Sequence, residues 1–229
     1  MIELLSYNTH LGKRIDEINN WARDLPNKPD VICYQELPES QVESSQASLP
    51  PSYRYEFAPG IIYNGETFGE QTLYDSSKVN LVSSRAVDLG LGFLERALKH
   101  SGQRSALLTA FEIERHEFMV ANVHLSWFAT HRRRREQLGA VIEAIEPQKP
   151  ALIVGDFNYT SMIKGGGLVN FLEQEGFQPA GGRLITHRFF GIGQQVDYIF
   201  QRNCTILEVR VEDIDLSDHA PIFVRFEVN

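Results

Sequence analysis

The chain has 229 residues, of which 42% are hydrophobic and 23% charged, and its formal net charge is −8. This composition is typical of a globular protein with a substantial core, and we expect one domain over residues 1–229. No apolar run approaches the ~20 residues of a membrane span, and the acidic total argues against a protein that coats nucleic acid over its whole surface. A local basic groove, or a carboxylate cluster neutralised by a cation, stays compatible with this charge.

The amino-terminal segment and the cysteines bear on location. MIELLSYNTH lacks a basic region followed by a long apolar stretch, so we expect no secretion signal. Cys33 and Cys204 are far apart in sequence, and Cys33 lies within the apolar run DVICYQE. Such cysteines are more often reduced core residues than a disulfide, so the expected location is the cytoplasm. Nothing in the sequence indicates an obligate protein partner.

Short β-branched or aromatic runs bounded by turn residues predict most of the structure as strands. In chain order these runs cover residues 2–8, 30–35, 53–58, 78–83, 105–113, 117–124, 151–156, 195–201, 204–212 and 221–228. Apolar residues at helical spacing predict helices over residues 15–25, 138–145 and 168–172. So many strands with few helices are best buried as two sheets packed face to face, with the helices outside, in an α/β fold.

Two regions with turn-forming composition, residues 38–52 and 59–77, are predicted to be loops. The triple glycine at residues 165–167 is not followed by Lys-Ser or Lys-Thr. It is therefore predicted to be a flexible turn before a helix and not a phosphate-binding loop.

Polar side chains stand where the predicted strands end. They are Asn8, Gln35, Glu36, Asn122, His124, Asp156, Asn158, Asp197, Asp218 and His219. Each alone has an ordinary explanation: Asn8 could end a turn, and His124 could be a satisfied core histidine. Asp197 is harder to explain, because an ionised carboxylate within an apolar strand is costly unless it is paired, for example with a histidine. Together, these strand ends indicate a site.

The chemistry that fits these residue types is hydrolysis of a phosphate ester with a hard divalent cation. Mg²⁺ binds carboxylate and amide oxygens and keeps several waters, and Mn²⁺ is an alternative. Zinc is less favoured, because no Cys or His cluster has zinc spacing. An attacking water needs a base and the developing charge needs donors, which Asp156, Asn158, His219 and His124 could supply.

Six motifs occur in one order along the chain: YN, QE, NVHL, GDFN, VDYIF and SDHAP, from residue 7 to residue 221. GDFN or SDH alone is a weak signal, but the ordered set resembles the endonuclease/exonuclease/phosphatase superfamily. That superfamily includes DNase I, exonuclease III-type abasic endonucleases, neutral sphingomyelinases and inositol polyphosphate 5-phosphatases. The resemblance implies a four-layer α/β/β/α sandwich with two central mixed sheets, which agrees with the strand count.

The resemblance also implies roles for residues at matching positions. Glu36 would bind the metal, with Asn8 and Asp218 nearby in the metal or phosphate shell. Asp156 would orient or deprotonate the attacking water, and Asn158 would hold a phosphate oxygen.

Two histidines and one arginine complete the implied site. Asp197 would pair with His219 and keep its imidazole aimed at the scissile phosphate. His124 stands where sphingomyelinases and DNase I have a histidine, and Glu70 is a candidate acidic partner for it. Arg104 lies near the position of a phosphate-contacting arginine in many members, although a strand-edge arginine is equally expected there.

One departure narrows the subgroup. His10, two residues after Asn8, stands where the abasic endonucleases carry an acidic metal ligand. That subgroup is therefore disfavoured.

Nucleic acid, and DNA in particular, is the preferred substrate, because VDYIF is nearer the nuclease members. The alternative is a phosphodiesterase or phosphatase that acts on a lipid headgroup or a small phosphate ester, which His124 and the acidic total charge favour. A non-catalytic binding module is disfavoured, because a degenerate copy would have lost Glu36, Asp156 or His219.

The basic run THRRRREQL, residues 130–138, would place four arginines in the first turn of a helix capped by Thr130. Four cations at a helix amino terminus oppose the helix dipole, whereas a bound phosphate there would be stabilised. Arg132 and Arg135 are therefore candidate phosphate contacts. The alternative, that these arginines form a solvated basic face paired with acidic loops, is equally expected.

Replacing Arg132 to Arg135 together with glutamine tests whether this run binds an anion. If it does, steady-state kinetics should show a substrate KM raised far more than chemical denaturation shows stability lowered. Unchanged kinetics would contradict an anion site in this run.

Overall fold

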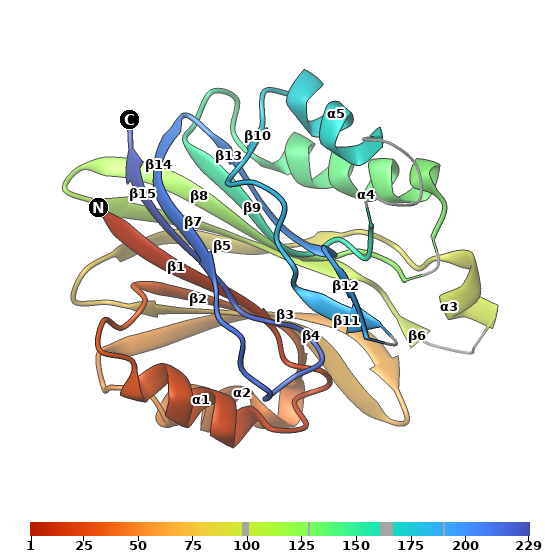
Figure 1. Cartoon of the computed structure of the whole chain (residues 1–229), viewed down its shortest axis with the longest axis horizontal. Coiled ribbons are helices and arrows are strands. Elements are labelled where there is room, and N and C mark those ends of the chain that lie inside the picture. Colours follow the sequence, from red (N-terminus) through yellow and green to blue (C-terminus); the bar gives the residue numbers. More distant parts are fainter. Residues whose placement is uncertain (98–100, 128, 161–166, 190) are drawn as a thin grey trace.

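The computed structural model describes the whole chain except residues 98–100, 128, 161–166 and 190 (Figure 1). The elements, in chain order, are β1 (Ile2–Asn8), α1 (Ile15–Asp24), β2 (Val31–Pro38), the 3₁₀ helix η1 (Glu39–Gln41), α2 (Val42–Ala47), β3 (Tyr53–Tyr63), β4 (Glu66–Asp75), β5 (Asn80–Asp88), α3 (Phe93–Ala97), β6 (Ser101–Gly102), β7 (Ser105–Ile113), β8 (His116–His124), α4 (His131–Ala144), β9 (Ala151–Asp156), α5 (Gly167–Gln174), β10 (Gln178–Pro179), β11 (His187–Phe189), β12 (Ile192–Gln194), β13 (Asp197–Arg202), β14 (Cys204–Val211) and β15 (Ile222–Val228).

Two mixed β-sheets form the centre of the molecule, as the strand count predicts. One has the strand order β14-β15-β1-β2-β4-β3-β6 and the other β10-β13-β9-β8-β7-β5, while β11 and β12 form a separate hairpin. Helices α1 and α2 lie outside the first sheet, and α4 and α5 lie outside the second (Figure 1). The architecture is therefore the expected four-layer α/β/β/α sandwich.

The alternation of side chains along each strand divides the core into three layers. Leu4 and Val31 of the first sheet pack with Val120 and Val154 of the second, in the layer between the sheets. Their chain neighbours, such as Leu5, face outward against the helices. Because strand side chains alternate with a period of two, a residue two or four positions further along the same strand points to the same face of the sheet.

The regions predicted to be loops are largely regular, so that prediction is wrong. Residues 38–52 contain η1 and α2, and residues 59–77 contain the end of β3 and all of β4. Asn64 and Gly65 join these strands with positive φ angles of 53° and 82°. An Asn-Gly pair in this conformation is the preferred two-residue hairpin turn, but the polar composition of the flanking strands obscures it.

Three smaller expectations have different outcomes. Cys33 and Cys204 are both buried and reduced, as predicted. Gly165 and Gly166 lie outside the described residues, so the proposed turn is visible only from Gly167, where α5 begins. No helix in the described part of the chain is long and apolar enough to cross a bilayer.

One glycine allows the close approach of the two strands that carry His124 and Asp156. Gly155 in β9 has φ 129°, and a Cβ built on it would lie 2.1 Å from the carbonyl oxygen of Val123 in β8. Both features exclude a side chain, because φ is in the left-handed region and the added atom meets rigid backbone.

We expect Gly155→Ala to lower the free energy of unfolding by at least about 2 kcal/mol, through strain and overpacking. Gly139→Ala is the matched control, because a Cβ at this position in α4 meets nothing within 4 Å. That control should raise stability by about 0.5–1 kcal/mol through helix propensity. Urea denaturation of both variants checks the pair, and equal effects would contradict the steric argument.

Candidate active site

The predicted strand-end residues meet where the two sheets come together. Asn8 ends β1, His124 ends β8, Asp156 ends β9 and Asp197 begins β13. Each stands two or four residues from a side chain of the layer between the sheets, so each continues the inner face beyond the apolar core. In the sheet, His124 of β8 and Asp197 of β13 are each paired directly with Asp156 of β9, so the three residues lie side by side across neighbouring strands.

A hydrogen-bonded amide connects the two sheets at this point. Asn8 Nδ2 donates to Asp156 Oδ2 at 3.1 Å and to Glu36 Oε1 at 3.3 Å. His124 Nε2 lies 3.5 Å from Glu36 Oε1 and 3.6 Å from Asp156 Oδ2. The carboxylates near His124 are therefore Glu36 and Asp156. Glu70, the candidate partner from the sequence, instead accepts a hydrogen bond from the Ser105 hydroxyl.

Glu36 reaches this cluster through a break in the regular strand. By alternation, Gln35 should face inward and Glu36 outward, and Gln35 does donate to Asn122 Oδ1 between the sheets at 2.7 Å. The pairing of β2 with β4 shifts register between Tyr34 and Leu37, and Glu36 has φ 57°. A non-glycine residue in the left-handed region costs of order 1 kcal/mol and is common at functional sites.

Asp156 and Asn158 form both a turn and part of the cluster. Asp156 Oδ1 accepts a hydrogen bond from the Asn158 backbone N–H at 2.7 Å, and Asn158 Nδ2 donates to Asp156 Oδ2 at 3.2 Å. Asn158 has φ 47°, and β9 has already ended, so simple strand alternation does not place its side chain. Phe157 between them is buried in the core beneath α4 and α5. This Asx turn therefore directs both polar side chains to one side.

Asp197 and His219 form a closely paired couple. His219 Nδ1 lies 2.8 Å from Asp197 Oδ2, and His219 Nε2 lies 3.9 Å from Asp156 Oδ2. Burial alone would lower the pKa of His219, but the adjacent charge and hydrogen bond of Asp197, with Asp156, raise it to about 10. The imidazole is therefore cationic at neutral pH and compensates the buried Asp197.

The other titratable groups of the cluster are shifted mainly by burial. Burial raises the pKa of Asp156 to about 7, against the opposing charge of His219. Burial also lowers the pKa of His124 well below its ordinary value, and the nearby Arg104 acts in the same direction. At neutral pH, His124 is therefore a neutral imidazole and Asp156 is close to its midpoint.

The donor set fits a divalent cation. Glu36, His124 and Asp156 each offer one ligand atom, and these atoms lie within 4.8 Å of one another. The carboxylates of Glu36, Asp156 and Asp197 converge here, while His219 is the only protonated imidazole among these site residues. Carboxylate oxygens suit Mg²⁺ or Mn²⁺, and the His124 nitrogen adds a donor that favours Mn²⁺ relative to Mg²⁺.

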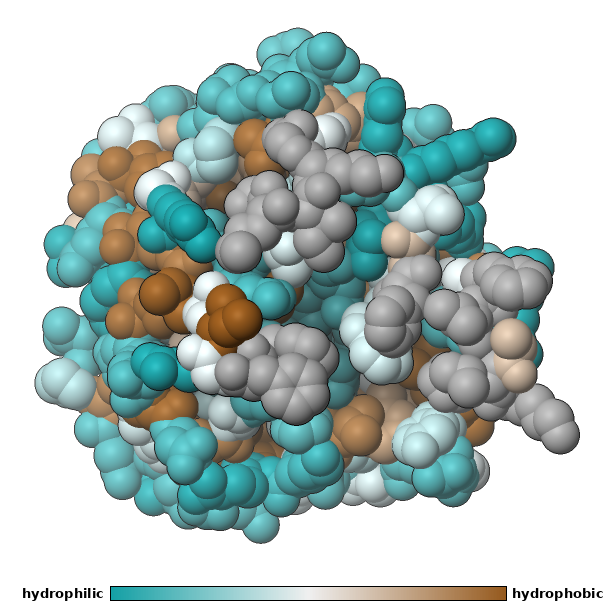
Figure 2. Space-filling view, turned by 45° about the vertical axis from the view of Figure 1, so that its right-hand side comes forward, coloured by the Kyte–Doolittle hydropathy of each residue, from teal (hydrophilic) through white to brown (hydrophobic). Residues whose placement is uncertain are grey.

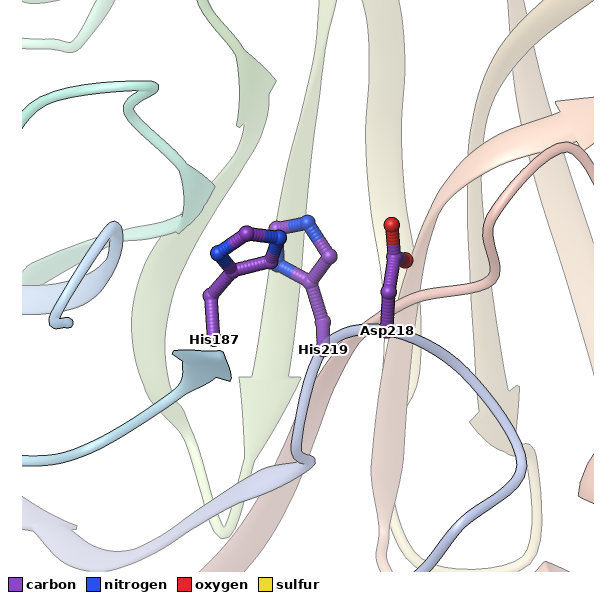
Figure 3. A group of neighbouring side chains, drawn as sticks. All are labelled: His187, Asp218 and His219. Atoms are coloured by element: carbon purple, nitrogen blue, oxygen red, sulfur yellow. The ribbon is translucent and has the colours of Figure 1, made fainter. Parts of the chain in front are cut away.

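Asp218 lies on the outer side of His219. Its Oδ1 is 3.1 Å from His10 Nδ1, and its side chain is 42% exposed. Figure 3 shows Asp218 beside His219, with the ring of His187 on the opposite side. The His187 and His219 ring centroids are 4.8 Å apart. Asp218 therefore stands at the rim and not between Glu36 and Asp156.

Arg104 is buried behind the cluster. Its Nε forms an ion pair with Glu95, and its Nη1 donates to the His124 carbonyl oxygen at 3.3 Å. Nearby, burial raises the pKa of Glu70 to about 8, against the opposing charge of Arg104. The described contacts of the Arg104 side chain are thus with the backbone at the end of β8 and with the carboxylate of Glu95.

The arginine run begins α4, as predicted, and Thr130 caps it by accepting a hydrogen bond from the Arg133 N–H at 3.2 Å. Arg132 is 90% exposed and pairs with Glu136, while the Arg135 guanidinium lies 4.9 Å from the centroid of Phe171. No described contact joins either residue to the carboxylate cluster.

Two further residues near the site were not singled out from the sequence, although Arg134 belongs to the basic run. His187 belongs to the β11–β12 hairpin, and its backbone pairs with His219. Arg134 is buried, and the charge of Asp156 acts on it. For Arg134 the available signal was helical spacing, because it lies four residues before Leu138 on the buried face of α4; for His187 the sequence carries no comparable signal.

The strand ends lie toward the side of the molecule that is turned forward in Figure 2, which shows a hydrophilic hollow near its centre. Exposed apolar side chains also occur at this end of the sheets. They are Ile62 and Tyr63 at the β3–β4 turn, Trp127 after β8, and Ile185 and Ile192 at the β11–β12 hairpin.

The Asp197–His219 pair can be tested in the metal-free protein by NMR titration of the His219 imidazole. Asp197→Asn should shift its pKa from about 10 toward or below the ordinary value, because burial then lacks its main opposing charge. Since the folded-state pKa is raised, this pair stabilises the protein below about pH 6.5, and the contribution is lost as pH rises toward 10. Asp197→Asn should therefore flatten the alkaline decline in stability.

The control for this titration is Asp213→Asn, which removes a carboxylate that is 91% exposed. In this control variant, the pKa of His219 measured by NMR should equal that of the wild type. A wild-type midpoint near 6.5 would contradict the assigned pairing.

Comparison with known proteins agrees with the fold. The family model described as "Endonuclease/Exonuclease/phosphatase family" matches residues 5–219. The crystal structure of an endonuclease/exonuclease/phosphatase from Bacteroides vulgatus superposes with TM-score 0.81 and 20% identity, covering 100% of this chain and 99% of that one. The mannosyl-6-phosphatase Bt3783 of Bacteroides thetaiotaomicron superposes with TM-score 0.70 and 17% identity, covering 99% of each chain.

Among curated proteins, a UPF0294 protein of Erwinia tasmaniensis is 33% identical over 130 residues, which are 55% of this chain and 48% of that protein. The chain thus spans about half the length of the curated relatives it matches. The extent of the family match and the shared fold lead to one conclusion: the chain belongs to the endonuclease/exonuclease/phosphatase family and has its phosphoesterase fold.

Proposed function

We propose that the protein is a divalent-metal-dependent phosphodiester hydrolase, and that DNA is its preferred substrate. The observation that carries this proposal is the arrangement around Asp156. Its Oδ2 lies within 4 Å of Asn8 Nδ2, His124 Nε2 and the charged His219 Nε2, and Glu36 lies beside the first two. A base, a cation site and a positive donor therefore converge on one buried point, which is the inventory that attack of water on a phosphate ester requires.

Asp156 is the proposed base. In the metal-free protein, burial raises its pKa to about 7. A divalent cation beside it would lower this value and keep the carboxylate ionised, ready to accept a proton from water. The Asn158 backbone N–H and the Asn8 amide hold its two oxygens in place. The attacking water would thus be oriented as well as deprotonated.

Glu36, Asp156 and His124 would hold the cation, with Asn8 beside them. When bound, a divalent ion supplies positive charge that polarises the phosphate and lowers the pKa of a coordinated water.

His219 and Asn158 are proposed to stabilise the negative charge that develops on phosphate oxygens. His219 can donate from Nε2, because Asp197 engages Nδ1 and keeps the ring protonated. Asn158 Nδ2 donates to the Leu125 carbonyl oxygen at 3.0 Å and to Asp156 Oδ2 at 3.2 Å, so donation to a phosphate oxygen would replace the second of these bonds. His219 is held in place by Asp197, and a fixed donor of this kind costs no reorganisation during the reaction.

Three observations bear on the substrate. Trp127, three residues after His124, is 56% exposed at the site end of the molecule, and exposed aromatic rings stack on unpaired bases. This favours a nucleic-acid end or single strand. Ile185 and Ile192 on the β11–β12 hairpin are also exposed, and they favour the second candidate, a phosphate ester carried by a lipid headgroup. A small phosphomonoester is the third substrate class, since a neighbouring fold belongs to a mannosyl-6-phosphatase.

The proposal can be tested with supercoiled plasmid, bis(p-nitrophenyl) phosphate and p-nitrophenyl phosphate, each with Mg²⁺ or Mn²⁺. We expect hydrolysis of the diesters, loss of activity in EDTA, and a kcat lowered by about 10²–10⁴ in Asp156→Asn. The thermal unfolding midpoint of Asp156→Asn should be no lower than that of the wild type, because a neutral amide removes a buried charge.

The control is Asp24→Asn, which changes an exposed carboxylate at the end of α1 and should leave all three rates unchanged. Hydrolysis of the monoester alone would replace the phosphodiesterase assignment with a phosphatase. A folded protein that cleaves none of the three and binds nucleic acid equally well in EDTA would instead support a binding module.

A further inference from the structure

Arg134 is a buried cation that has no carboxylate partner among the described residues. Its side chain is 8% exposed, and its one described hydrogen bond runs from Nη1 to the Ala129 carbonyl oxygen at 2.6 Å. Its Nε is buried and has no hydrogen-bond partner in the part of the chain that the structure describes. A buried charge is costly unless it is paired and hydrogen-bonded, and a neutral carbonyl compensates it only in part.

The other arginines of this region are compensated. Arg132 and Arg133 both pair with Glu136, Arg135 stacks on Phe171, and Arg104 pairs with Glu95. None of the ion pairs among the described residues includes Arg134. The exception is therefore particular to this position and is not a general property of the basic run.

The surroundings of Arg134 place it beside the reaction centre. Burial lowers its pKa, and the groups that act in the opposite direction are the carboxylate of Asp156 and the hydroxyl of Tyr159. Side chains of a helix point toward its amino terminus, and Arg134 accordingly reaches back to Ala129, before the first turn of α4. Asn158, which adjoins Tyr159, bonds to Leu125 in the segment that leads to Ala129.

We infer that Arg134 binds an anionic phosphate oxygen of the substrate at the α4 side of the site. The ligand class is a phosphate group, either the scissile one or its neighbour along the substrate. This inference rests on the proposed function for its substrate and refines the expectation for the basic run: one arginine, turned inward, supplies the contact. Guanidinium is suited to the task, because it stays charged when buried and presents several donors in a plane.

A purely structural role predicts a different result. If Arg134 only supports the loop before α4, its removal should lower stability and leave phosphate binding unchanged. If it is held ready for an anion, its removal should cost little stability, because an uncompensated charge disappears together with one hydrogen bond.

The test measures binding of inorganic phosphate to the metal-free protein, from the phosphate dependence of the thermal unfolding midpoint. The variants are Arg134→Met, Arg134→Lys and the control Arg23→Met, which changes an exposed arginine at the end of α1. We expect Arg134→Met to weaken the phosphate Kd at least about tenfold, which is about 1.4 kcal/mol. Arg134→Lys should have an intermediate Kd and Arg23→Met an unchanged one, and without phosphate Arg134→Met should match this control in stability.

A second measurement uses bis(p-nitrophenyl) phosphate and Mn²⁺. Arg134→Met should raise KM at least about tenfold with a smaller change in kcat, whereas Arg23→Met should change neither. If Arg134→Met does not fold, Arg134→Lys decides the question, since it keeps a cation but loses the planar donor set.

Equal phosphate affinity in the wild type and Arg134→Lys or Arg134→Met would overturn the inference, as would a wild type that shows no phosphate-dependent shift. Failure of the proposed function looks different. A protein that hydrolyses no phosphate ester, yet loses phosphate binding on Arg134→Met, would overturn the hydrolase assignment and keep the anion site. An active enzyme with unaltered Kd and KM in the variants would overturn the anion site alone.

Discussion

The alternation of side chains along the central strands is the constraint on which the site depends. Residues at every second position fill the layer between the sheets with apolar groups, up to Val154 in β9 and Ile199 in β13. Where the strands end, the same parity continues with Asp156 and Asp197. The site is thus the polar edge of the inter-sheet core, and its rigidity follows from the packing that fixes those strands.

That location has an electrostatic consequence. Carboxylates at the edge of an apolar layer are poorly solvated, which raises the pKa of Asp156 and makes the charge of Asp197 costly unless it is compensated. Within the chain, His219 provides that compensation for Asp197, and a divalent cation would do so for Glu36 and Asp156. The same balance that stabilises the fold therefore prepares a base and a cationic donor, and the unpaired charge of Arg134 extends it to an anionic ligand.

Deviations from regular structure occur where parity alone would misplace a side chain. Glu36 reaches the cluster through a register shift and a left-handed φ, and Asn158 through an Asx turn. Gly155 removes the side chain that would otherwise separate β9 from β8. These local costs are concentrated within a few residues of Asp156, which is the pattern expected when function and not stability selects the conformation.

The sequence by itself determined the two-sheet architecture, the ordered motifs and the grouping of strand-end residues, because strand periodicity is a local property and the end of each apolar run marks the end of a strand. It also predicted the capped start of α4 and the reduced cysteines. It missed the β3–β4 hairpin, whose Asn64-Gly65 turn lies between strands of mixed polarity.

Only the tertiary structure decided which groups face one another. It places Glu36 and Asp156 near His124, and it bonds Glu70 to Ser105 instead. It also turns Arg134 inward, while Arg132 stays in solvent. These outcomes depend on how two sheets and a helix pack across long sequence separations, and no local pattern encodes such distances.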